Sequence, residues 1–155
     1  PATLRPLAAR DSSAARALIT STLGDAPYAE ALLAVLESTL ARATDEYQAI
    51  VACDASALVG LIVFGETAGA RGAGRIHLIA VDAIARRRGL ATQLIDAACA
   101  RLGEQGGRLA MIEIPTERRL AGVRRLAERA GFHEAGRIDD YARDGVALVL
   151  LRREL

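Results

Sequence analysis

The chain has 155 residues, 52% of them hydrophobic, and a formal net charge of +1 at neutral pH. Such a composition is typical of one folded domain, here residues 1–155, and excludes an intrinsically disordered protein. The weak net charge gives no electrostatic reason to expect a nucleic-acid partner. Apolar runs such as Ala57 to Phe64 are far too short to cross a bilayer, and no secretory signal begins at Pro1, so we expect a cytoplasmic protein without membrane contact.

The pattern of apolar residues predicts alternating strands and helices. Apolar side chains recur three and four residues apart in the helical segments, whereas the strand segments are short runs bounded by Gly, Pro, Asp or Ser. The expected elements are, in chain order, a strand at 3–7, helices at 12–22 and 28–43, strands at 47–53, 57–66 and 76–81, a helix at 90–102, a strand at 108–114, a helix at 117–130, and strands at 132–141 and 146–152. This order, β-α-α-β-β-β-α-β-α-β-β, predicts a single-domain α/β fold with a mixed central sheet of about seven strands and four helices.

A glycine-rich segment, Gly69 to Gly74, precedes the fourth expected strand. Its glycines have the spacing of a P-loop, but Arg75 and Ile76 stand where Lys and Ser or Thr are required, and a P-loop opens a helix rather than a strand. We interpret the segment as a hairpin connection. Nucleotide binding by this segment is a weaker alternative.

The most informative segment is residues 75–102. An apolar run at 76–81 predicts a buried strand, Asp82 ends it, and three arginines and a glycine, residues 86–89, lead into a helix that begins at Leu90. The first N–H groups of a helix have no intrahelical partner and carry the positive end of the helix dipole, and a glycine lets an anion approach the backbone. Arginines add fork-shaped donors. The segment therefore predicts an anion site, although a solvated basic turn explains the same residues.

The chain has two cysteines and two histidines. Cys53 and Cys99 lie in apolar surroundings on an expected strand and an expected helix, so we expect buried, inert thiols rather than a disulfide. His77 and His133 are isolated, and their spacing indicates no metal site. We therefore expect no metal cofactor.

Three segments resemble the GNAT acetyltransferase superfamily. Residues 86–91, R-x-x-G-x-A, are similar to the (Q/R)-x-x-G-x-(G/A) pyrophosphate loop of that family. Residues 126–132, L-x-x-x-x-G-F, are similar to its L-Y-x-x-x-G-F helix ending, and the tail YARDGVALVLLRREL, residues 141–155, looks like its closing hairpin. The expected element order matches the GNAT fold over essentially the whole chain.

This resemblance implies that acetyl-CoA binds between splayed fourth and fifth strands. Its acetyl group would pass directly to a primary amine of a small molecule or a protein, without a metal or a covalent enzyme intermediate. The pantetheine arm would pair with the strand backbone, and the diphosphate would lie on the N–H groups of the loop. The implied cofactor-binding residues are Ile79, Ala80, Val81, Arg86, Arg87, Arg88, Gly89, Leu90, Ala91 and Thr92.

Direct transfer needs a group that takes a proton from the acceptor ammonium, and the departing thiolate benefits from a proton donor. The resemblance makes Glu113 the first candidate for the base. His77 is the second, because strand alternation predicts it on the face opposite Ile76 and Leu78; a solvent-facing carboxylate and a structural histidine are the alternatives. The family's usual acid is a tyrosine, but Ala127 stands at that position, and Leu120 stands where an Asn is often found. The thiolate would therefore leave unassisted, or water or Tyr141 would supply the proton.

In the family, the loop between the first two helices and the closing hairpin shape the acceptor pocket. Here they would supply Asp25, Tyr28 and Asp140 as substrate-binding residues, with Glu30 and Asp139 nearby. An acidic lining would favour a cationic amine by charge pairing, although acids are also ordinary loop residues.

Two further expectations concern the type of protein. Because Ala127 and Leu120 replace polar residues of the family, a non-catalytic acyl-CoA-binding or regulatory module is the alternative function. The high apolar content also predicts a homodimer, since exposed apolar patches mark interfaces.

Overall fold

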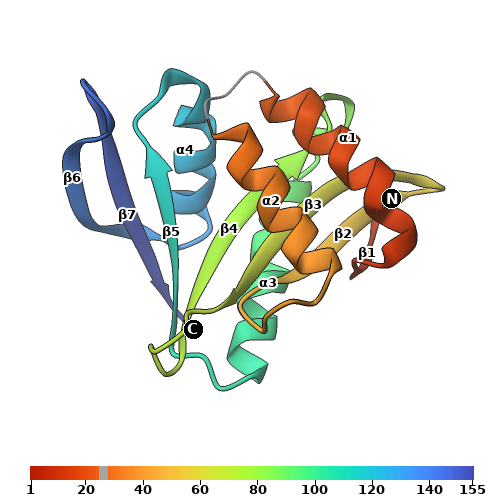
Figure 1. Ribbon diagram of the computed structural model, residues 1–155, viewed down its shortest axis with the longest axis horizontal. Coiled ribbons are helices and arrows are strands. Elements are labelled where there is room, and N and C mark those ends of the chain that lie inside the picture. The colour runs from red at the N-terminus through yellow and green to blue at the C-terminus, as the bar shows by residue number, and fades with distance from the viewer. Residues whose placement is uncertain (25–27) are drawn as a thin grey trace.

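The computed structural model describes residues 1–24 and 28–155 (Figure 1). Within these residues the chain forms, in order, β1 (Thr3–Pro6), α1 (Ser12–Leu23), α2 (Ala29–Leu40), β2 (Gln48–Asp54), β3 (Ala57–Glu66), β4 (Ala73–Val81), α3 (Leu90–Glu104), β5 (Leu109–Pro115), α4 (Ala121–Arg129), β6 (His133–Arg143) and β7 (Val146–Glu154). The predicted element order and the mixed seven-stranded sheet are confirmed.

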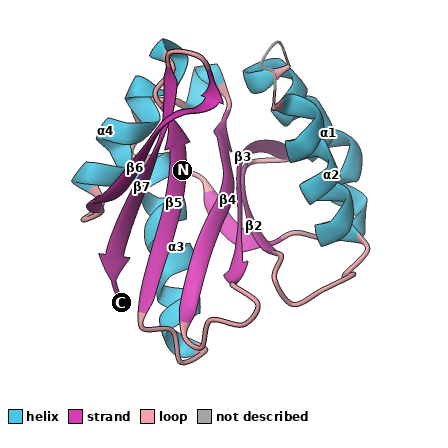
Figure 2. Cartoon of the chain, turned by 60° about the vertical axis from the view of Figure 1, so that its left-hand side comes forward, coloured by secondary structure: helices cyan, strands magenta, loops and turns pink. Residues whose placement is uncertain are grey.

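The strands form one sheet in the order β1-β2-β3-β4-β5-β7-β6. Helices α1 and α2 lie on one face of this sheet and α3 and α4 on the other, as Figures 1 and 2 show. Successive residues of a strand point to opposite faces, so Leu61 and Val63 of β3 enter the core under α1 and α2, whereas Ile62 and Phe64 enter the core under α3 and α4. Burial on both faces explains why this strand is a continuous apolar run in the sequence.

The sheet divides where β4 and β5 meet. These two strands are parallel and pair only from Ala73↔Leu109 to Ile76↔Ile112. Beyond these pairs, residues 78–81 of β4 are paired with β3 alone, His77 is skipped by a bulge, and residues 113–115 of β5 are paired with β7 alone. We call the gap between these two stretches the fork. Backbone N–H and C=O groups along its two edges have no strand partner across it.

Several predicted boundaries differ from the structure, and two of the differences have a clear physical cause. The helix predicted from residue 117 begins at Ala121, because Thr116 continues the pairing of β5 with β7: its N–H donates to the Ala147 carbonyl at 2.9 Å, and its hydroxyl accepts from the Ala147 N–H at 3.0 Å. A short 3₁₀ turn, Arg118–Leu120, follows. The fourth strand begins at Ala73 rather than at residue 76, because antiparallel pairing with β3 already starts at Glu66↔Gly74.

The glycine-rich segment joins β3 to β4 as a hairpin connection, as predicted. The Thr67 N–H donates to the Ala73 carbonyl at 2.7 Å, and the Gly72 N–H donates to the Glu66 carboxylate at 2.9 Å. The segment lies between two strands and does not precede a helix. A P-loop arrangement is therefore contradicted.

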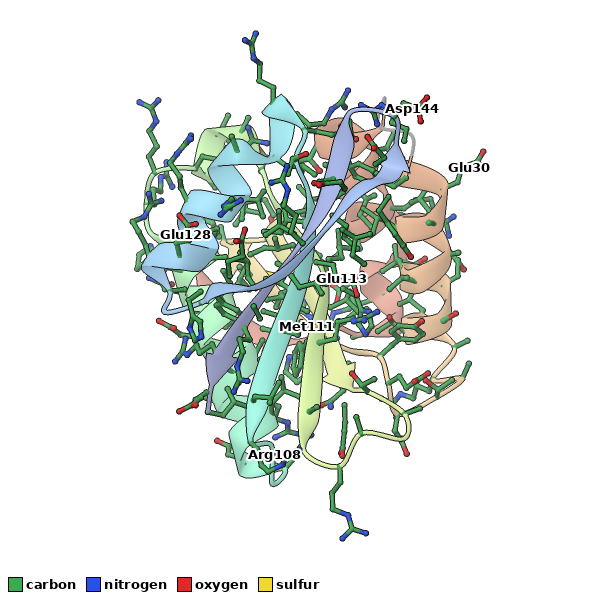
Figure 3. All side chains as sticks on the ribbon, turned by 90° about the vertical axis from the view of Figure 1, so that its left-hand side faces the viewer. Glu30, Arg108, Met111, Glu113, Glu128 and Asp144 are labelled. Carbon is green, nitrogen blue, oxygen red and sulfur yellow. The ribbon has the colours of Figure 1, made fainter. Side chains whose placement is uncertain are left out.

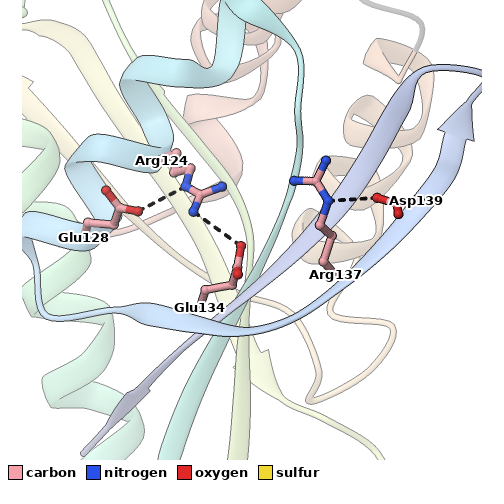
Figure 4. Close-up of polar contacts among 5 residues, drawn as sticks. All are labelled: Arg124, Glu128, Glu134, Arg137 and Asp139. Atoms are coloured by element: carbon pink, nitrogen blue, oxygen red, sulfur yellow. Dashed lines mark hydrogen bonds and ion pairs between the residues drawn. The ribbon is translucent and has the colours of Figure 1, made fainter.

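Ion pairs connect α4 to the edge strand β6 (Figure 4). Arg124 lies 3.0 Å from a carboxylate oxygen of Glu128 and 3.4 Å from one of Glu134, while Arg137 and Asp139 pair at 2.8 Å within β6. Exposed ion pairs of this kind contribute little to stability. Their relevance is that the charge of Arg124 is neutralised by its neighbours.

Neither cysteine forms a disulfide. Cys99 is buried in the core under α3 and α4, and burial raises the pKa of its thiol. Cys53 was expected to be buried but is only half-buried, because it lies at the end of β2 opposite Thr3 of the short edge strand β1. Across the described residues, no helix is long and apolar enough to span a membrane, and no three metal-ligating side chains of His, Cys, Asp or Glu cluster.

Asp11 is a buried acid that ties β1 to the start of α1. Its side chain accepts two hydrogen bonds from Arg5, each 2.7 Å long, and one from the Ala8 N–H at 2.8 Å. The neighbouring Arg5 guanidinium lowers the pKa of this carboxyl to about 2. The folded protein therefore keeps Asp11 ionised in conditions where the unfolded chain binds a proton.

We expect Asp11 to make stability sensitive to acid. Its pKa is lower in the folded state than the ordinary value of 3.8, so its contribution is complete above that value and is lost as the pH falls toward 2. Asp11→Asn should lower the free energy of unfolding at pH 7 by about 1 to 2 kcal/mol and should flatten the pH dependence between about pH 4 and pH 2. Urea unfolding at several pH values measures both effects; identical pH profiles of wild type and variant would contradict the expectation.

A left-handed glycine ends α4. Gly131 has a φ of +91°, its N–H donates to the Glu128 carbonyl at 3.1 Å, and the Phe132 N–H donates to the Ala127 carbonyl at 3.0 Å. These two bonds are those of a Schellman motif, in which the residue after the glycine packs back on the helix. The motif gives a physical reason for the Gly131–Phe132 ending of this helix.

Gly131→Ala should destabilise the protein by about 1 kcal/mol, because a β-carbon disfavours the left-handed conformation. Gly103→Ala is the matched control: Gly103 lies inside α3 with open space around it, so the same substitution should stabilise by about 0.5 to 1 kcal/mol. Chemical denaturation of both variants measures the difference. Effects of the same sign would refute this account of Gly131.

Candidate active site

A cleft of about 1170 Å³ lies between α3 and α4 and reaches the fork. Residues 79–81 of β4 border it, and residues 86–92 form one wall around the start of α3. Residues 116–129 contribute to the opposite wall. Thr22 at the end of α1 and Arg143 at the tip of the β6–β7 hairpin also border the cleft, so elements from both ends of the chain meet there.

The loop before α3 is held in a specific backbone conformation. Asp82 accepts a hydrogen bond from the Ile84 N–H at 3.0 Å, and Arg86 Nε donates to the Val81 carbonyl at 3.2 Å. Arg87 and Gly89 both have positive φ angles, +66° and +74°. A β-carbon placed on Gly89 would meet no atom within 4 Å. Glycine is therefore favoured here by the left-handed backbone, and its exposed side faces open space.

The first turn of α3 is available to an anion. No side chain caps the helix, and its first turn holds no acidic residue. Residues 86–89 are exposed, while Ala91 and Thr92 are half-buried at the cleft. Such N–H groups, with the helix dipole behind them, are suited to bind an anion.

Nine of the ten predicted cofactor-binding residues border this cleft. The exception is Arg88, whose guanidinium turns to the β2–β3 hairpin and lies 3.5 Å from the Asp54 carboxylate. Three consecutive arginines cannot all point the same way. Which of them turns away from the cleft depends on the position of Asp54, which the sequence alone does not give.

Glu113 lies on β5 immediately after Ile112, the last residue of β5 that pairs with β4. Its neighbours Ile112 and Ile114 enter the core under α3 and α4, so strand alternation turns Glu113 to the opposite face, on the same side as Met111 (Figure 3). One carboxylate oxygen accepts from Arg75 Nη2 at 2.6 Å, and the other makes no hydrogen bond with a described residue. This ion pair links β4 to β5 at the start of the fork.

His77 occupies a β-bulge on the other side of the fork. Val63 and Phe64 of β3 pair with Leu78 and Ile76, which leaves His77 without a partner on β3. Its ring meets the Tyr47 ring edge-on at a centroid distance of 4.8 Å. Burial, and after it the charge of Arg75, lower the pKa of His77, so the imidazole is neutral at pH 7.

The candidate proton donors lie elsewhere. Tyr141 is 64% exposed on β6 and does not border the cleft. Ala127 is buried in the core, and Leu120 borders the cleft with an apolar side chain. None of the described residues that line the cleft is a tyrosine.

The predicted acceptor-binding residues do not form one acidic pocket among the described residues. Asp25 lies outside the described residues, and Tyr28 is half-buried just before α2. Asp140 has a φ of +55° and accepts from the Gly145 N–H at 2.8 Å, so it shapes the β6–β7 turn. Glu30 extends into solvent from α2 (Figure 3).

The wall opposite the loop carries residues that the sequence analysis did not assign to a site. Gly122, Leu126 and Arg129 of α4 border the cleft, and Arg118 of the preceding turn joins them. Their spacing of four, four and three residues is that of one helical face, so periodicity was an available signal. It was unspecific, because arginines occur throughout this segment and most of them lie on other faces.

Comparisons with known proteins agree with this geometry. Residues 14–132 match the model of the acetyltransferase (GNAT) family. A candidate GNAT acetyltransferase from Desulfovibrio desulfuricans has a similar structure, with a TM-score of 0.90 and 25% identity over 99% of each chain. No curated protein matches the chain.

Two further solved structures share the fold at lower identity. A ribosomal-protein-alanine N-acetyltransferase from Brucella melitensis has a TM-score of 0.80 at 18% identity, over 99% of each chain. A NatC complex solved with a Gag peptide and CoA has a TM-score of 0.80 at 22% identity, over 99% of this chain and 98% of that one. With the family match covering most of the sequence, the chain belongs to the GNAT family of acetyltransferases.

Proposed function

We propose that this protein is an acetyl-CoA-dependent N-acetyltransferase that acetylates a primary amine by direct attack. The observation that carries the proposal is the continuity between an uncapped, glycine-led helix start and a sheet fork with unpaired strand edges. The first suits a diphosphate, and the second suits an extended amide-bearing arm that adds to a strand edge. Coenzyme A has both parts in one molecule.

The residues of the cleft fit the cofactor in detail. Arg86, Arg87 and Gly89, with the first N–H groups of α3, would hold the diphosphate, and residues 79–81 would pair with the pantetheine arm. Acetyl-CoA would supply an activated thioester at the fork. The N–H groups of β4 that border the fork have no partner on β5. They are suited to donate hydrogen bonds to a carbonyl oxygen that develops negative charge.

The opposite face of the sheet would receive the amine. Glu113 has one unengaged carboxylate oxygen beside the fork, and Arg75 holds its other oxygen in place. We assign the base to Glu113, because the acceptor ammonium must lose a proton to something near the fork. His77, neutral and half-buried at the bulge, is the second candidate. No proton donor is assigned to the thiolate, since a thiol is acidic enough to leave without much help.

Gly89→Val should weaken CoA binding at least about tenfold, because a side chain would enter the space where the diphosphate lies and would strain the loop. Gly69→Val is a matched control: Gly69 has a similar φ, +79° against +74°, and equally open surroundings, but lies in the β3–β4 hairpin. Isothermal titration calorimetry with CoA measures both variants. Equal affinity in the two, or no binding by the wild type, would count decisively against the proposed site.

Glu113→Gln should lower kcat about a hundredfold with little change in CoA affinity, because it removes the proposed base but keeps the shape of the side chain. Glu128→Gln is the control, since Glu128 also pairs with an arginine but lies on α4 outside the cleft. Release of free CoA thiol over a panel of amines measures the rate. An unchanged kcat would remove Glu113 from the mechanism.

A non-catalytic acyl-CoA-binding module is the second candidate function. It is favoured by the absence of any tyrosine among the described residues of the cleft and by the apolar residues at positions 120 and 127. The same titrations and rate assays separate the two functions. Tight CoA binding without thiol release for any amine would select the module.

A further inference from the structure

One half of the sheet has an uncovered face. Helices α1 and α2 lie over β2, β3 and β4, whereas no described helix covers β5, β7 and β6 on that side, as Figure 2 shows. Ile112 of β5 and Leu151 of β7 enter the core under α3 and α4. By strand alternation, the side chains next to them point to the uncovered face, and these are Met111, Glu113, Leu150 and Arg152. The acceptor amine of the proposed function would arrive on this same face.

Arg152 is the unsatisfied group of this face. Its side chain is 38% exposed, and its Nε is buried and donates no hydrogen bond within the described part of the chain. Glu154 pairs with it at 3.6 Å, which is beyond hydrogen-bond distance, and is itself 83% exposed. The next residue, Arg153, turns to the other face and is satisfied there by Asp96 at 3.0 Å and by the Ala130 carbonyl at 2.9 Å. Of the two neighbouring guanidinium groups, only Arg152 is therefore free to bind a planar anion through two parallel bonds.

The register of β5 and β7 brings Arg152 close to the proposed base. Arg152 pairs with Met111 and Glu113 pairs with Leu150, so Arg152 and Glu113 are diagonal neighbours on one face of an antiparallel pair. Diagonal neighbours are about 7 to 8 Å apart, within the reach of a long side chain. Arg152 nevertheless donates no hydrogen bond to Glu113, because Arg75 binds one of its oxygens and the other is unengaged. A free carboxylate oxygen and a free guanidinium thus lie within reach of one small ligand.

The surface around these two charged groups is apolar. Met111 and Leu150 are half-buried and occupy the other two positions of the four. Gly136 of the edge strand β6 pairs with Leu150 and has no side chain to cover it. A ligand bound here would meet one negative group, one positive group and hydrocarbon beside both.

We infer that the acceptor is a free α-amino acid, whose carboxylate Arg152 binds while Glu113 receives its ammonium. The inference rests on the proposed function and names the substrate class. An α-amino acid carries both charged groups on the same carbon atom, in the order in which this face presents their counter-charges. Arg152 determines specificity, since it would bind the substrate but move no proton.

The reaction balances with the groups already assigned. Glu113 takes one proton from the ammonium, and the nitrogen lone pair then forms a bond to the acetyl carbon. The bond from that carbon to sulfur breaks, and coenzyme A leaves as the thiolate. The products are an N-acetyl amino acid and coenzyme A. No oxidant, reductant or further reactant is needed.

Release of free CoA thiol from acetyl-CoA tests the substrate class with matched sets of amines. Each set is an α-amino acid, its amide and the amine left when the carboxylate is removed, for example leucine, leucinamide and isopentylamine. At least one amino acid should be acetylated with a kcat/KM about tenfold or more above that of its amide and its amine, as expected for charge-assisted hydrogen bonds to a carboxylate.

Arg152→Gln separates carboxylate binding from a structural role. The variant should raise KM for the amino acid about tenfold or more with little change in kcat, and should leave the kinetics of the amide and the affinity for CoA unchanged. Arg125→Gln is the matched control: Arg125 is an exposed arginine of α4, on the other face of the sheet, and forms no ion pair with a described residue. It removes the same charge and should change none of these values.

Two results would overturn the amino-acid acceptor and leave the proposed function intact. One is acetylation of amides or simple amines as fast as of every amino acid. The other is an equal loss on amino acid and amide in Arg152→Gln. Tight CoA binding without thiol release for any amine would instead refute the proposed function.

Discussion

The separation of β4 from β5 is the constraint on which the rest of the site depends. Two parallel strands that pair at one end and diverge at the other leave backbone donors and acceptors that the sheet cannot satisfy. The Arg75–Glu113 ion pair lies where the pairing stops and joins the two strands there. Because α3 begins shortly after β4 ends, the uncapped helix start lies beside the open strand edges rather than at a distance from them.

The sheet also separates two electrostatic environments. The cleft on the side of α3 and α4 is lined by guanidinium groups and helix N–H groups, which suit an anionic cofactor. The opposite face beside the fork holds the carboxylate of Glu113 and the neutral imidazole of His77, which suit the removal of a proton. A reaction between a molecule on each side could occur only through the fork. Under the proposed function, this arrangement fits direct transfer rather than a carrier residue on the protein.

Local patterns in the sequence were sufficient for the element order and for the position of the basic turn that opens α3. The change from a strand run to helical spacing at Leu90 marked the start of α3, and the Gly131–Phe132 ending of α4 is a local Schellman motif with a local cause. The boundary at residue 117 failed because a contact from β7, far along the chain, holds Thr116 in the sheet. Cys53 was misjudged for a similar reason, since its exposure depends on how short the neighbouring edge strand is.

By itself, the sequence determined which segments are strands and helices and that a basic turn opens a helix, because each of these depends on residues within one or two turns of each other. Only the tertiary structure decided which arginines face the cleft and which pair elsewhere. Arg88 pairs with Asp54, and Arg143 pairs with Glu117. Arg118 and Arg129 border the cleft and form an ion pair with no described residue. These outcomes depend on how distant segments pack. The sequence shows which side chains are charged, but only the folded structure shows which of these charges are neutralised by an ion pair.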